Sequence, residues 1–98
     1  MKTNGSHVIA DIWLDESITQ AKFIKHASAA LKCSKMTVLG ELVHDFGGEA
    51  FTGIWLLAES HFSIHYFPER KYAAVDCFTC GKEGNAMLAV CKLSELTN

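Results

Sequence analysis

The hydrophobic pattern of the chain begins with an alternating segment over His7–Trp13. Apolar side chains occur on both sides of the alternation, at Val8, Ala10 and Ile12 on one side and at Ile9 and Trp13 on the other. A period of two residues is typical of a β-strand. The segment is therefore predicted to be a strand whose two faces are both at least partly covered.

The next segment changes to helical spacing. Apolar residues recur three and four positions apart at Phe23, Ile24, Ala27, Ala30 and Leu31, and the opposite side carries Lys22, Lys25 and Lys32. Ser17 followed by Gln20 matches a capping box, in which the two side chains satisfy free amides at the start of a helix. The pattern predicts a helix over about Ser17–Cys33 with its lysine face in solvent.

The rest of the chain reads as four strands and a second helix. The predicted strands are Met36–His44, Thr52–Ala58, His61–Phe67 and Tyr72–Thr79, and the predicted helix is Asn85–Leu96, packing through Met87, Val90 and Cys91. Gly47-Gly48 is expected to end the first of these strands and separate it from the second. The tripeptide Glu59-Ser60-His61 is expected at or near the turn between Thr52–Ala58 and His61–Phe67.

The order β-α-β-β-β-β-α predicts the fold class. It is typical of an α/β (α+β) two-layer sandwich, with a largely antiparallel sheet and two helices on one face. One domain is expected over residues 1–98, because no linker, repeat or compositional boundary interrupts the chain. The other face of the sheet needs a cover, so a homodimer is also predicted.

Composition narrows the classes of function. The formal charge is −2 and the basic residues are scattered, so no nucleic-acid partner is expected. No segment approaches the ~18 apolar residues of a membrane span, and the amino terminus lacks a signal-peptide pattern. We therefore expect a cytoplasmic protein with no membrane partner. Its four cysteines are then expected to be reduced.

Glu59-Ser60-His61 brings an acid, a hydroxyl and an imidazole together. A serine hydroxyl can attack the carbonyl before it, and the steps that follow need a base and a group that stabilises the oxyanion. Strand geometry puts His61 and His65 on one face and Ser60 on the other, unless the turn rotates Ser60. Taken in isolation, such a tripeptide is more often a turn that makes local hydrogen bonds.

The tripeptide is not isolated, because further motifs follow at fixed positions. They are Ile64-His65, Pro68-Glu69, Tyr72-Ala73-Ala74-Val75-Asp76 and Phe78-Thr79-Cys80-Gly81, with weaker agreement at Gly5-Ser6-His7. From about Phe46 to Gly81 the chain resembles the prokaryotic S-adenosylmethionine decarboxylases. These enzymes cut their own chain before a serine and make a pyruvoyl cofactor from it.

The resemblance implies a role for each matching residue. Cleavage between Glu59 and Ser60 would give fragments 1–59 and 60–98, with the pyruvoyl group formed from Ser60. His65 matches an acid/base of this processing and Thr52 matches a hydroxyl that assists it. The pyruvoyl group would hold the substrate amine as a Schiff base and accept electrons as carbon dioxide leaves.

The remaining matches concern turnover and substrate binding. Cys80 matches the thiol that protonates the substrate carbon after decarboxylation. Phe46 and Phe67 match aromatic residues that sandwich the adenine, and Glu69 matches a carboxylate that holds the ribose. Aromatic faces also attract a sulfonium cation. Without the resemblance, the two phenylalanines would be read as ordinary core residues.

The chain departs from the family pattern at three places. Tyr66-Phe67 replaces the usual Thr-Trp before Pro68-Glu69, the loop around Gly47-Gly48 places the bulky Phe51 before Thr52, and the sequence stops soon after the second helix. These differences keep two alternatives open. One is decarboxylation of arginine or ornithine, and the other is a shortened, catalytically silent homologue that binds ligand or regulates a partner.

Other clusters of reactive residues lead to no further site. Cys77 and Cys80 are three residues apart on a predicted strand and should face opposite ways, which disfavours a redox pair and a zinc site shared with His61 and His65. His7, His26 and His44 have no second ligand nearby in sequence. No metal site is therefore predicted.

Overall fold

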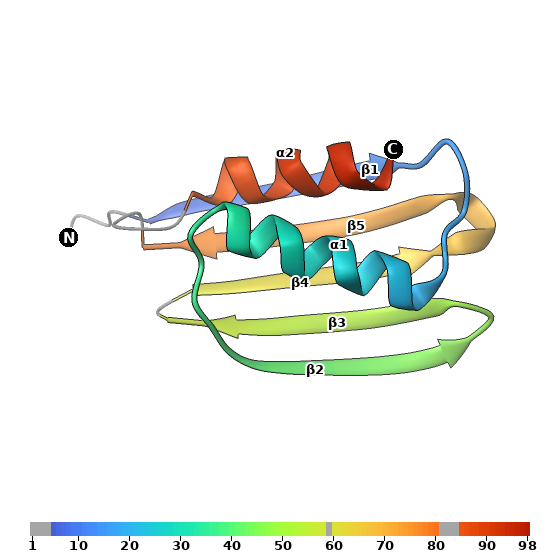
Figure 1. Ribbon diagram of the computed structural model, residues 1–98, viewed down its shortest axis with the longest axis horizontal. Coiled ribbons are helices and arrows are strands. Elements are labelled where there is room, and N and C mark those ends of the chain that lie inside the picture. Colours follow the sequence, from blue (N-terminus) through green and yellow to red (C-terminus); the bar gives the residue numbers. More distant parts are fainter. Residues whose placement is uncertain (1–4, 59, 81–84) are drawn as a thin grey trace.

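The computed structural model describes residues 5–58, 60–80 and 85–98. These residues form one antiparallel sheet in the order β1-β5-β4-β3-β2, with both helices on the same side of it (Figure 1). The strands are β1 (Ser6–Trp13), β2 (Val38–Gly47), β3 (Ala50–Leu57), β4 (Ser60–Phe67) and β5 (Tyr72–Thr79). The helices are α1 (Gln20–Cys33) and α2 (Ala86–Thr97), and a short 3-10 turn, η1 (Pro68–Arg70), joins β4 to β5. The predicted two-layer α/β fold is confirmed.

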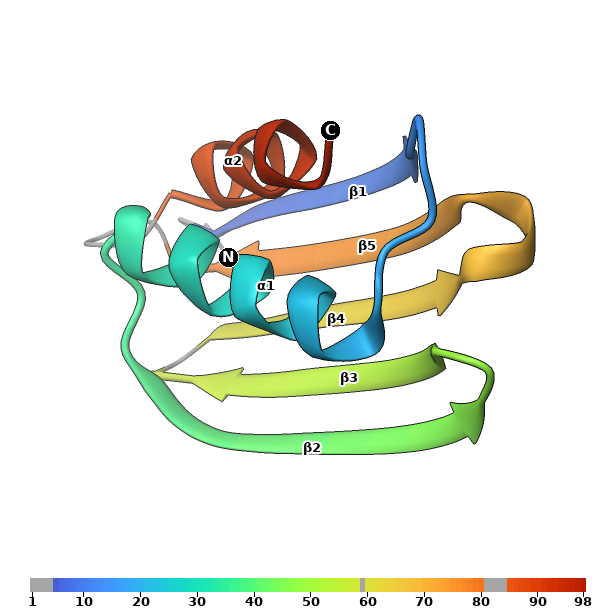
Figure 2. The same ribbon diagram turned by 45° about the vertical axis from the view of Figure 1, so that its right-hand side comes forward.

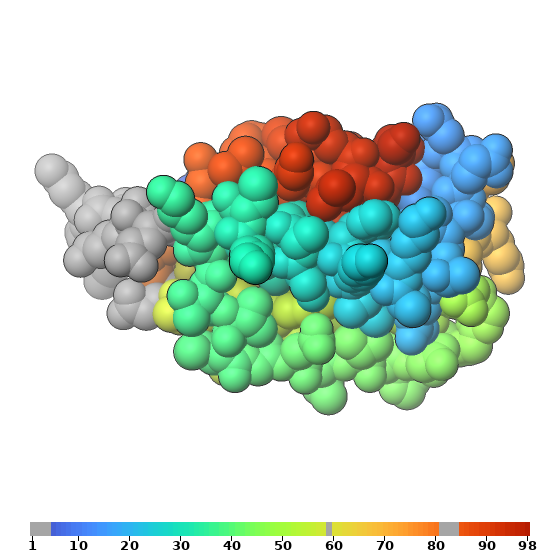
Figure 3. All heavy atoms as spheres, viewed as in Figure 1, coloured from blue at the N-terminus to red at the C-terminus, as the bar shows by residue number. Residues whose placement is uncertain are grey.

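The core lies between the sheet and the helix layer. Both helices run over the same sheet face, which we call the covered face (Figure 2). The largest fully buried side chains include Trp55, Tyr66, Phe23, Phe51 and Phe62. In the space-filling view α1 and α2 pack against each other in front of the central strands, while β2 lies at the lower edge (Figure 3). No described helix has the length and apolar character needed to cross a membrane.

The other side of the sheet, the open face, carries large apolar side chains that have no cover in a single chain. They are Ile9, Trp13, Leu42, Phe46, Ile54, Leu56 and Phe67, exposed by 43 to 75%. The expectation that β1 is covered on both faces is therefore wrong for one protomer. Ile9 and Trp13 point away from the helix layer, and only Ile12 on this strand is buried.

The helix boundaries correct two predictions. Thr19, not Ser17, caps α1, because the Thr19 side chain accepts a hydrogen bond from the amide of Lys22. The Ser17 hydroxyl instead donates to the Pro68 carbonyl, 2.6 Å away, which ties the segment before α1 to η1. The expected capping box is therefore absent at this helix start.

Helix α2 packs through Val90, as predicted, but not through Met87 or Cys91. Its buried positions are Ala86, Ala89, Val90, Leu93 and Thr97, which lie on one helical face. Met87 is 57% exposed and Cys91 is exposed as well. Ala86 and Ala89 are buried while the larger apolar residue Met87 is exposed, so hydrophobicity alone does not set the buried face.

The turn between β2 and β3 is conformationally restricted. Gly48 and Glu49 both have positive φ, +60° and +74°, as a two-residue hairpin turn of the primed type requires. Glycine adopts this region freely, whereas Glu49 does so at some cost. The Glu49 carboxylate accepts a 2.8 Å hydrogen bond from the backbone N–H of Gln20, which fixes the turn to the start of α1.

Candidate active site

Thr52 and His65 form a hydrogen-bonded pair on the open face. They are cross-strand partners on β3 and β4, and Thr52 Oγ1 lies 3.0 Å from His65 Nδ1. A hydroxyl held against an imidazole is a suitable arrangement for proton transfer. The structure thus brings together two of the residues that the resemblance assigned to processing.

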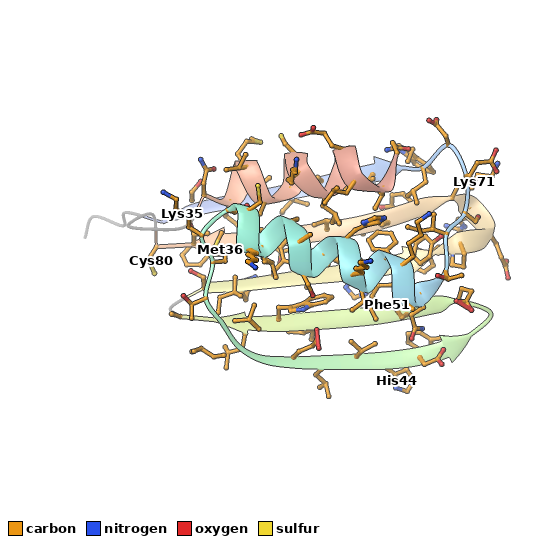
Figure 4. All side chains as sticks on the ribbon, in the orientation of Figure 1. Lys35, Met36, His44, Phe51, Lys71 and Cys80 are labelled. Carbon is orange, nitrogen blue, oxygen red and sulfur yellow. The ribbon has the colours of Figure 1, made fainter. Side chains whose placement is uncertain are left out.

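Ser60 and Cys80 lie at one end of the sheet, Ser60 at the start of β4 and Cys80 just after the end of the neighbouring strand β5. Ser60 is the first residue of β4, and the pairing of His61 with Phe78 places Ser60 beside the last residue of β5, just before Cys80. Figure 4 shows Cys80 at the end of the sheet opposite Lys71. Both Ser60 and Cys80 are half-buried. Glu59, the residue before the predicted cleavage point, lies outside the described residues.

Ser60 and His65 do not meet within one chain. His61 and His65 share the open face, as predicted, whereas Ser60 alternates with them and pairs with the buried Leu57. Five residue steps of a strand separate Ser60 from His65, which is roughly 16 Å. The predicted processing residues therefore fall into two groups at opposite ends of β4.

The predicted substrate residues gather near the His65 end. Phe67 and Glu69 line a shallow cavity of about 230 Å³ together with Gly47, Gly48, Ala50, Pro68 and Arg70. Phe46, 65% exposed at the end of β2, directly precedes this lining. The structure therefore places one aromatic ring, Phe67, and the Glu69 carboxylate at one opening, with Phe46 next to the lining in sequence.

An aromatic row leads to this cavity and was not predicted. Tyr72 stacks on Phe67 with ring centroids 5.9 Å apart, and Trp13 lies 4.5 Å from Tyr72 on the other side. The guanidinium of Arg70 is 5.9 Å from the Phe67 ring. The Tyr72 hydroxyl donates to Asp11, and this hydrogen bond is the main reason that the pKa of Tyr72 is raised. Sequence spacing could not reveal the row, because it depends on the pairing of β1 with β5.

A second unpredicted group lies toward the Ser60 end. Asp76 on β5 contacts His7 of β1 and His61 of β4 on the open face, with His61 Nε2 and Asp76 Oδ2 3.2 Å apart. His7 has no second ligand nearby in sequence, as expected, but strand pairing gives it a partner 69 residues away. His7 and Asp76 are far apart in sequence, and only the β1–β5 register brings them together.

The sequence of the chain also matches a known protein family. The sequence profile of the family described as S-adenosylmethionine decarboxylase matches residues 6–96. The chain belongs to the S-adenosylmethionine decarboxylase family. The match spans both ends of the candidate site and every described residue that the resemblance assigned to processing, turnover or substrate binding.

Individual relatives agree with this membership. The chain is 40% identical over 83 residues to the S-adenosylmethionine decarboxylase proenzyme of Symbiobacterium thermophilum, covering 81% of this chain and 62% of that protein. It is 39% identical over 92 residues to the proenzyme of a Hydrogenobaculum species, covering 91% and 69%. The crystal structure of the adenosylmethionine decarboxylase from Aquifex aeolicus matches with a TM-score of 0.87 at 30% identity, covering all of this chain and 83% of that one.

Tyr66, which departs from the usual family pattern, lies away from the candidate site. Its ring is buried on the covered face against Phe23, and its hydroxyl donates to the Ile18 carbonyl and accepts from the Ile18 amide, both at 2.9 Å. Of the two departures at Tyr66-Phe67, only Phe67 reaches the opening. The bulk of Tyr66 therefore belongs to the core of this member of the S-adenosylmethionine decarboxylase family.

Cys77 is likewise excluded from the chemistry. It is fully buried under the helices and forms no disulfide. Burial, with a smaller contribution from the charge of Asp76, raises the pKa of its thiol to about 11. A thiol with such a pKa is protonated at neutral pH and is a poor nucleophile.

Proposed function

We propose that this protein is a pyruvoyl-dependent S-adenosylmethionine decarboxylase that cuts its own chain between Glu59 and Ser60. The family match over residues 6–96 carries the proposal. The names of the relatives favour S-adenosylmethionine over arginine and ornithine as substrate. A decarboxylase of this substrate supplies aminopropyl groups for polyamine synthesis in the cytoplasm.

Self-cleavage uses Ser60 as the internal nucleophile. Its Oγ attacks the carbonyl carbon of Glu59, and the peptide bond is exchanged for an ester. Loss of the α-proton of Ser60 then breaks the ester Cβ–O bond, giving a carboxylate at Glu59 and a dehydroalanine. Water converts the dehydroalanine to a pyruvoyl group and releases ammonia. His65, hydrogen-bonded to Thr52, would move the protons in these steps.

The residues around Ser60 fit the resulting group. Ser60 is the half-buried first residue of β4, and the Cys80 thiol follows the end of the neighbouring strand β5. The pyruvoyl group would supply the electron sink for loss of carbon dioxide. Cys80 would deliver a proton to the substrate carbon, since a thiol gives up its proton more readily than a hydroxyl does.

The cavity beside η1 would hold the rest of the substrate. Phe46 and Phe67 would enclose the adenine, and the Glu69 carboxylate would accept hydrogen bonds from the ribose hydroxyls. Aromatic faces near the sulfonium would add about 0.5–2 kcal/mol of cation–π attraction. These contacts distinguish S-adenosylmethionine from arginine and ornithine, which have neither adenine nor ribose.

A homodimer would unite the two ends of the site. The apolar open face is exposed in one chain, and such a surface marks an interface. Two sheets packed face to face about a two-fold axis perpendicular to the strands would lie about 10 Å apart and run in opposite directions. The strand end that carries Ser60 and Cys80 in one protomer would then approach the end that carries His65 and Glu69 in the other, and the Ser60 side chain, which alternates onto the covered side, would have to turn toward the interface at its strand end. The separation of roughly 16 Å along β4 would thereby be bridged.

Intact mass spectrometry of purified protein tests the proposal. We expect fragments 1–59 and 60–98, with reduction by borohydride in the presence of an amine labelling only the second. Labelled carbon dioxide should be released from S-adenosylmethionine and not from arginine or ornithine. Ser60→Ala should abolish both cleavage and release, whereas the control Ser63→Ala, an open-face serine on the same strand, should retain both.

The outcomes separate the alternatives. A chain that stays whole and resists amine trapping would overturn the enzyme assignment and favour a silent regulatory homologue. Cleavage with carbon dioxide release only from arginine or ornithine would overturn the assignment of the substrate but not that of the enzyme class. Cys80→Ala should still be cleaved but should turn over slowly. If it turns over normally, Cys80 is not the proton donor.

A further inference from the structure

His7, His61 and Asp76 converge on the open face, outside the residues assigned to processing and substrate binding. Each offers one ligand atom, and these atoms all lie within 4.8 Å of one another. The ε nitrogens of both imidazoles face the carboxylate, one at each oxygen. Three side chains from three strands therefore point at one small volume.

The sheet holds this cluster in a fixed geometry. His7 and His61 are both register partners of Phe78, so they flank β5 at the same level. The Phe78 ring contacts both imidazoles, with centroid distances of 6.0 and 6.1 Å. Asp76 lies two residues before Phe78 and so shares its face. Ligands on paired strands are positioned more rigidly than ligands on loops.

We propose that His7, His61 and Asp76 form a binding site for one zinc-like divalent transition-metal ion. Two imidazoles and one carboxylate form a donor set that zinc and neighbouring metals accept, whereas magnesium and calcium prefer oxygen ligands alone. With metal–ligand bonds of about 2.0–2.1 Å, ligand atoms in a tetrahedral site lie roughly 3.3 Å apart. His61 Nε2 and Asp76 Oδ2, at 3.2 Å, already have this spacing.

Small side-chain movements complete the site. The direct hydrogen bond between His7 Nε2 and Asp76 Oδ1 must break. Each of the two residues would then bind the ion instead. Each imidazole must give up a proton or change tautomer, so binding weakens as pH falls. Three protein ligands leave a fourth position toward the open face, for water or for a ligand atom from a molecule that covers this face.

Metal titration tests the site directly and does not depend on self-cleavage. Untagged protein is stripped with a chelator, and Zn²⁺ is titrated calorimetrically, with Co²⁺ added separately to record the visible absorption of a four-coordinate site. We expect one ion per chain and a rise in the midpoint of thermal unfolding. Ser60→Ala, which should remain uncleaved, is expected to bind equally well.

Substitutions then assign the ligands. Asp76→Asn keeps the shape of the side chain but removes the charge, and we expect its affinity to fall by roughly tenfold or more, as it should in His61→Ala. The matched control is His44→Ala, since His44 lies on the same face of β2, at the opposite edge of the sheet from β1. Folding of each variant is checked by circular dichroism. The proposal is overturned if wild type binds no ion, or if Asp76→Asn and His61→Ala bind as well as His44→Ala.

Discussion

Residues on the covered face of β4 and residues on its open face alternate along the same strand, but they differ in exposure and chemistry. Phe62, Ile64 and Tyr66 point to the helices and are at most 1% exposed. His61, Ser63 and His65 point the other way, where His65 pairs with Thr52 of β3 and His61 with Asp76 of β5. The covered face is thus a packed core, whereas the open face carries reactive groups among uncovered apolar side chains. Folding and chemistry should therefore be separable by substitution.

The largest effect is expected on the open face, in His65→Ala. Loss of an acid/base group should slow processing by about 10²–10⁴-fold, while stability changes little because the side chain is exposed. The time course of intact mass measures the first quantity, and urea unfolding the second. His26→Ala, on α1 in the other layer, serves as the control and should be processed at the normal rate.

Complementation between two variants sharpens this prediction. If the site is shared between protomers, co-expression of His65→Ala with Ser60→Ala pairs an intact Ser60 with an intact His65 in each mixed dimer. The His65→Ala chain should then be cleaved while the Ser60→Ala chain stays whole. Cleavage that is not restored would show that His65 does not act across the dimer.

On the covered face, Phe62→Ala should act on stability instead. Removal of a fully buried ring that lies 5.8 Å from Trp55 should lower the free energy of unfolding by about 3–5 kcal/mol. Met87→Ala is the control, because this exposed apolar residue of α2 should cost only about 0.5 kcal/mol. Equal losses in the two variants would contradict the face that the structure assigns to α2.

A charge on the open face should break the proposed dimer. Ile54→Asp would place an unpaired carboxylate at the centre of the interface, which costs several kcal/mol and should raise the dimer dissociation constant on the order of 100-fold. Sedimentation velocity over a concentration series measures this shift. Ser28→Asp adds the same charge to the exposed side of α1 and should leave assembly unchanged. A wild-type chain that sediments as a monomer would exclude the shared site.

The fold was largely predictable from the sequence because alternation and helical spacing are local signals. Five strands and both helices were predicted within a few residues of their observed positions, since buried positions such as Phe62 and Leu93 recur at the period of their own element. The cap of α1 was missed because Ser17 and Thr19 both suit a helix start. Only the tertiary contact of Ser17 with Pro68 decides between them.

The site was predictable only where a motif marks it. Thr52 and His65 were found by resemblance, and their hydrogen bond follows from the β3–β4 hairpin. The partnership of His7 with Asp76 depends instead on the pairing of the first strand with the last, which no local pattern specifies. Strand periodicity already put Ser60 and His65 on opposite faces, but the distance between them follows from the extended course of β4, which the sequence pattern did not fix.

A smaller effect is expected at Tyr66, which ties the covered face of β4 to the segment before α1. Tyr66→Phe removes the hydroxyl that bonds both backbone groups of Ile18, and it leaves the ring in the core. We expect a loss of about 0.5–2 kcal/mol, because two hydrogen bonds disappear and two backbone groups are left without their partner. Processing should be unaffected, since the hydroxyl lies on the covered side. A loss of cleavage with little loss of stability would contradict the position assigned to Tyr66.

The smallest effect is expected from Asp76→Asn in metal-free protein, and it should depend on pH. The pKa of Asp76 is lowered from its ordinary value of 3.8, so the charged form stabilises the folded state. That contribution is fully present above about pH 4, and it is lost as pH falls through the lower pKa of the folded protein. It should amount to less than about 1 kcal/mol, because the pair is partly exposed.

Unfolding by urea at several pH values checks this sign. Wild type should be the more stable protein at pH 5–7, and its advantage over Asp76→Asn should shrink as pH falls below about 4, because asparagine carries no charge to lose. A difference that stays constant down to pH 3 would mean that Asp76 acts through shape rather than charge. A difference that grows with acid would mean that its folded pKa lies above the ordinary value and that the two imidazoles do not stabilise its charge.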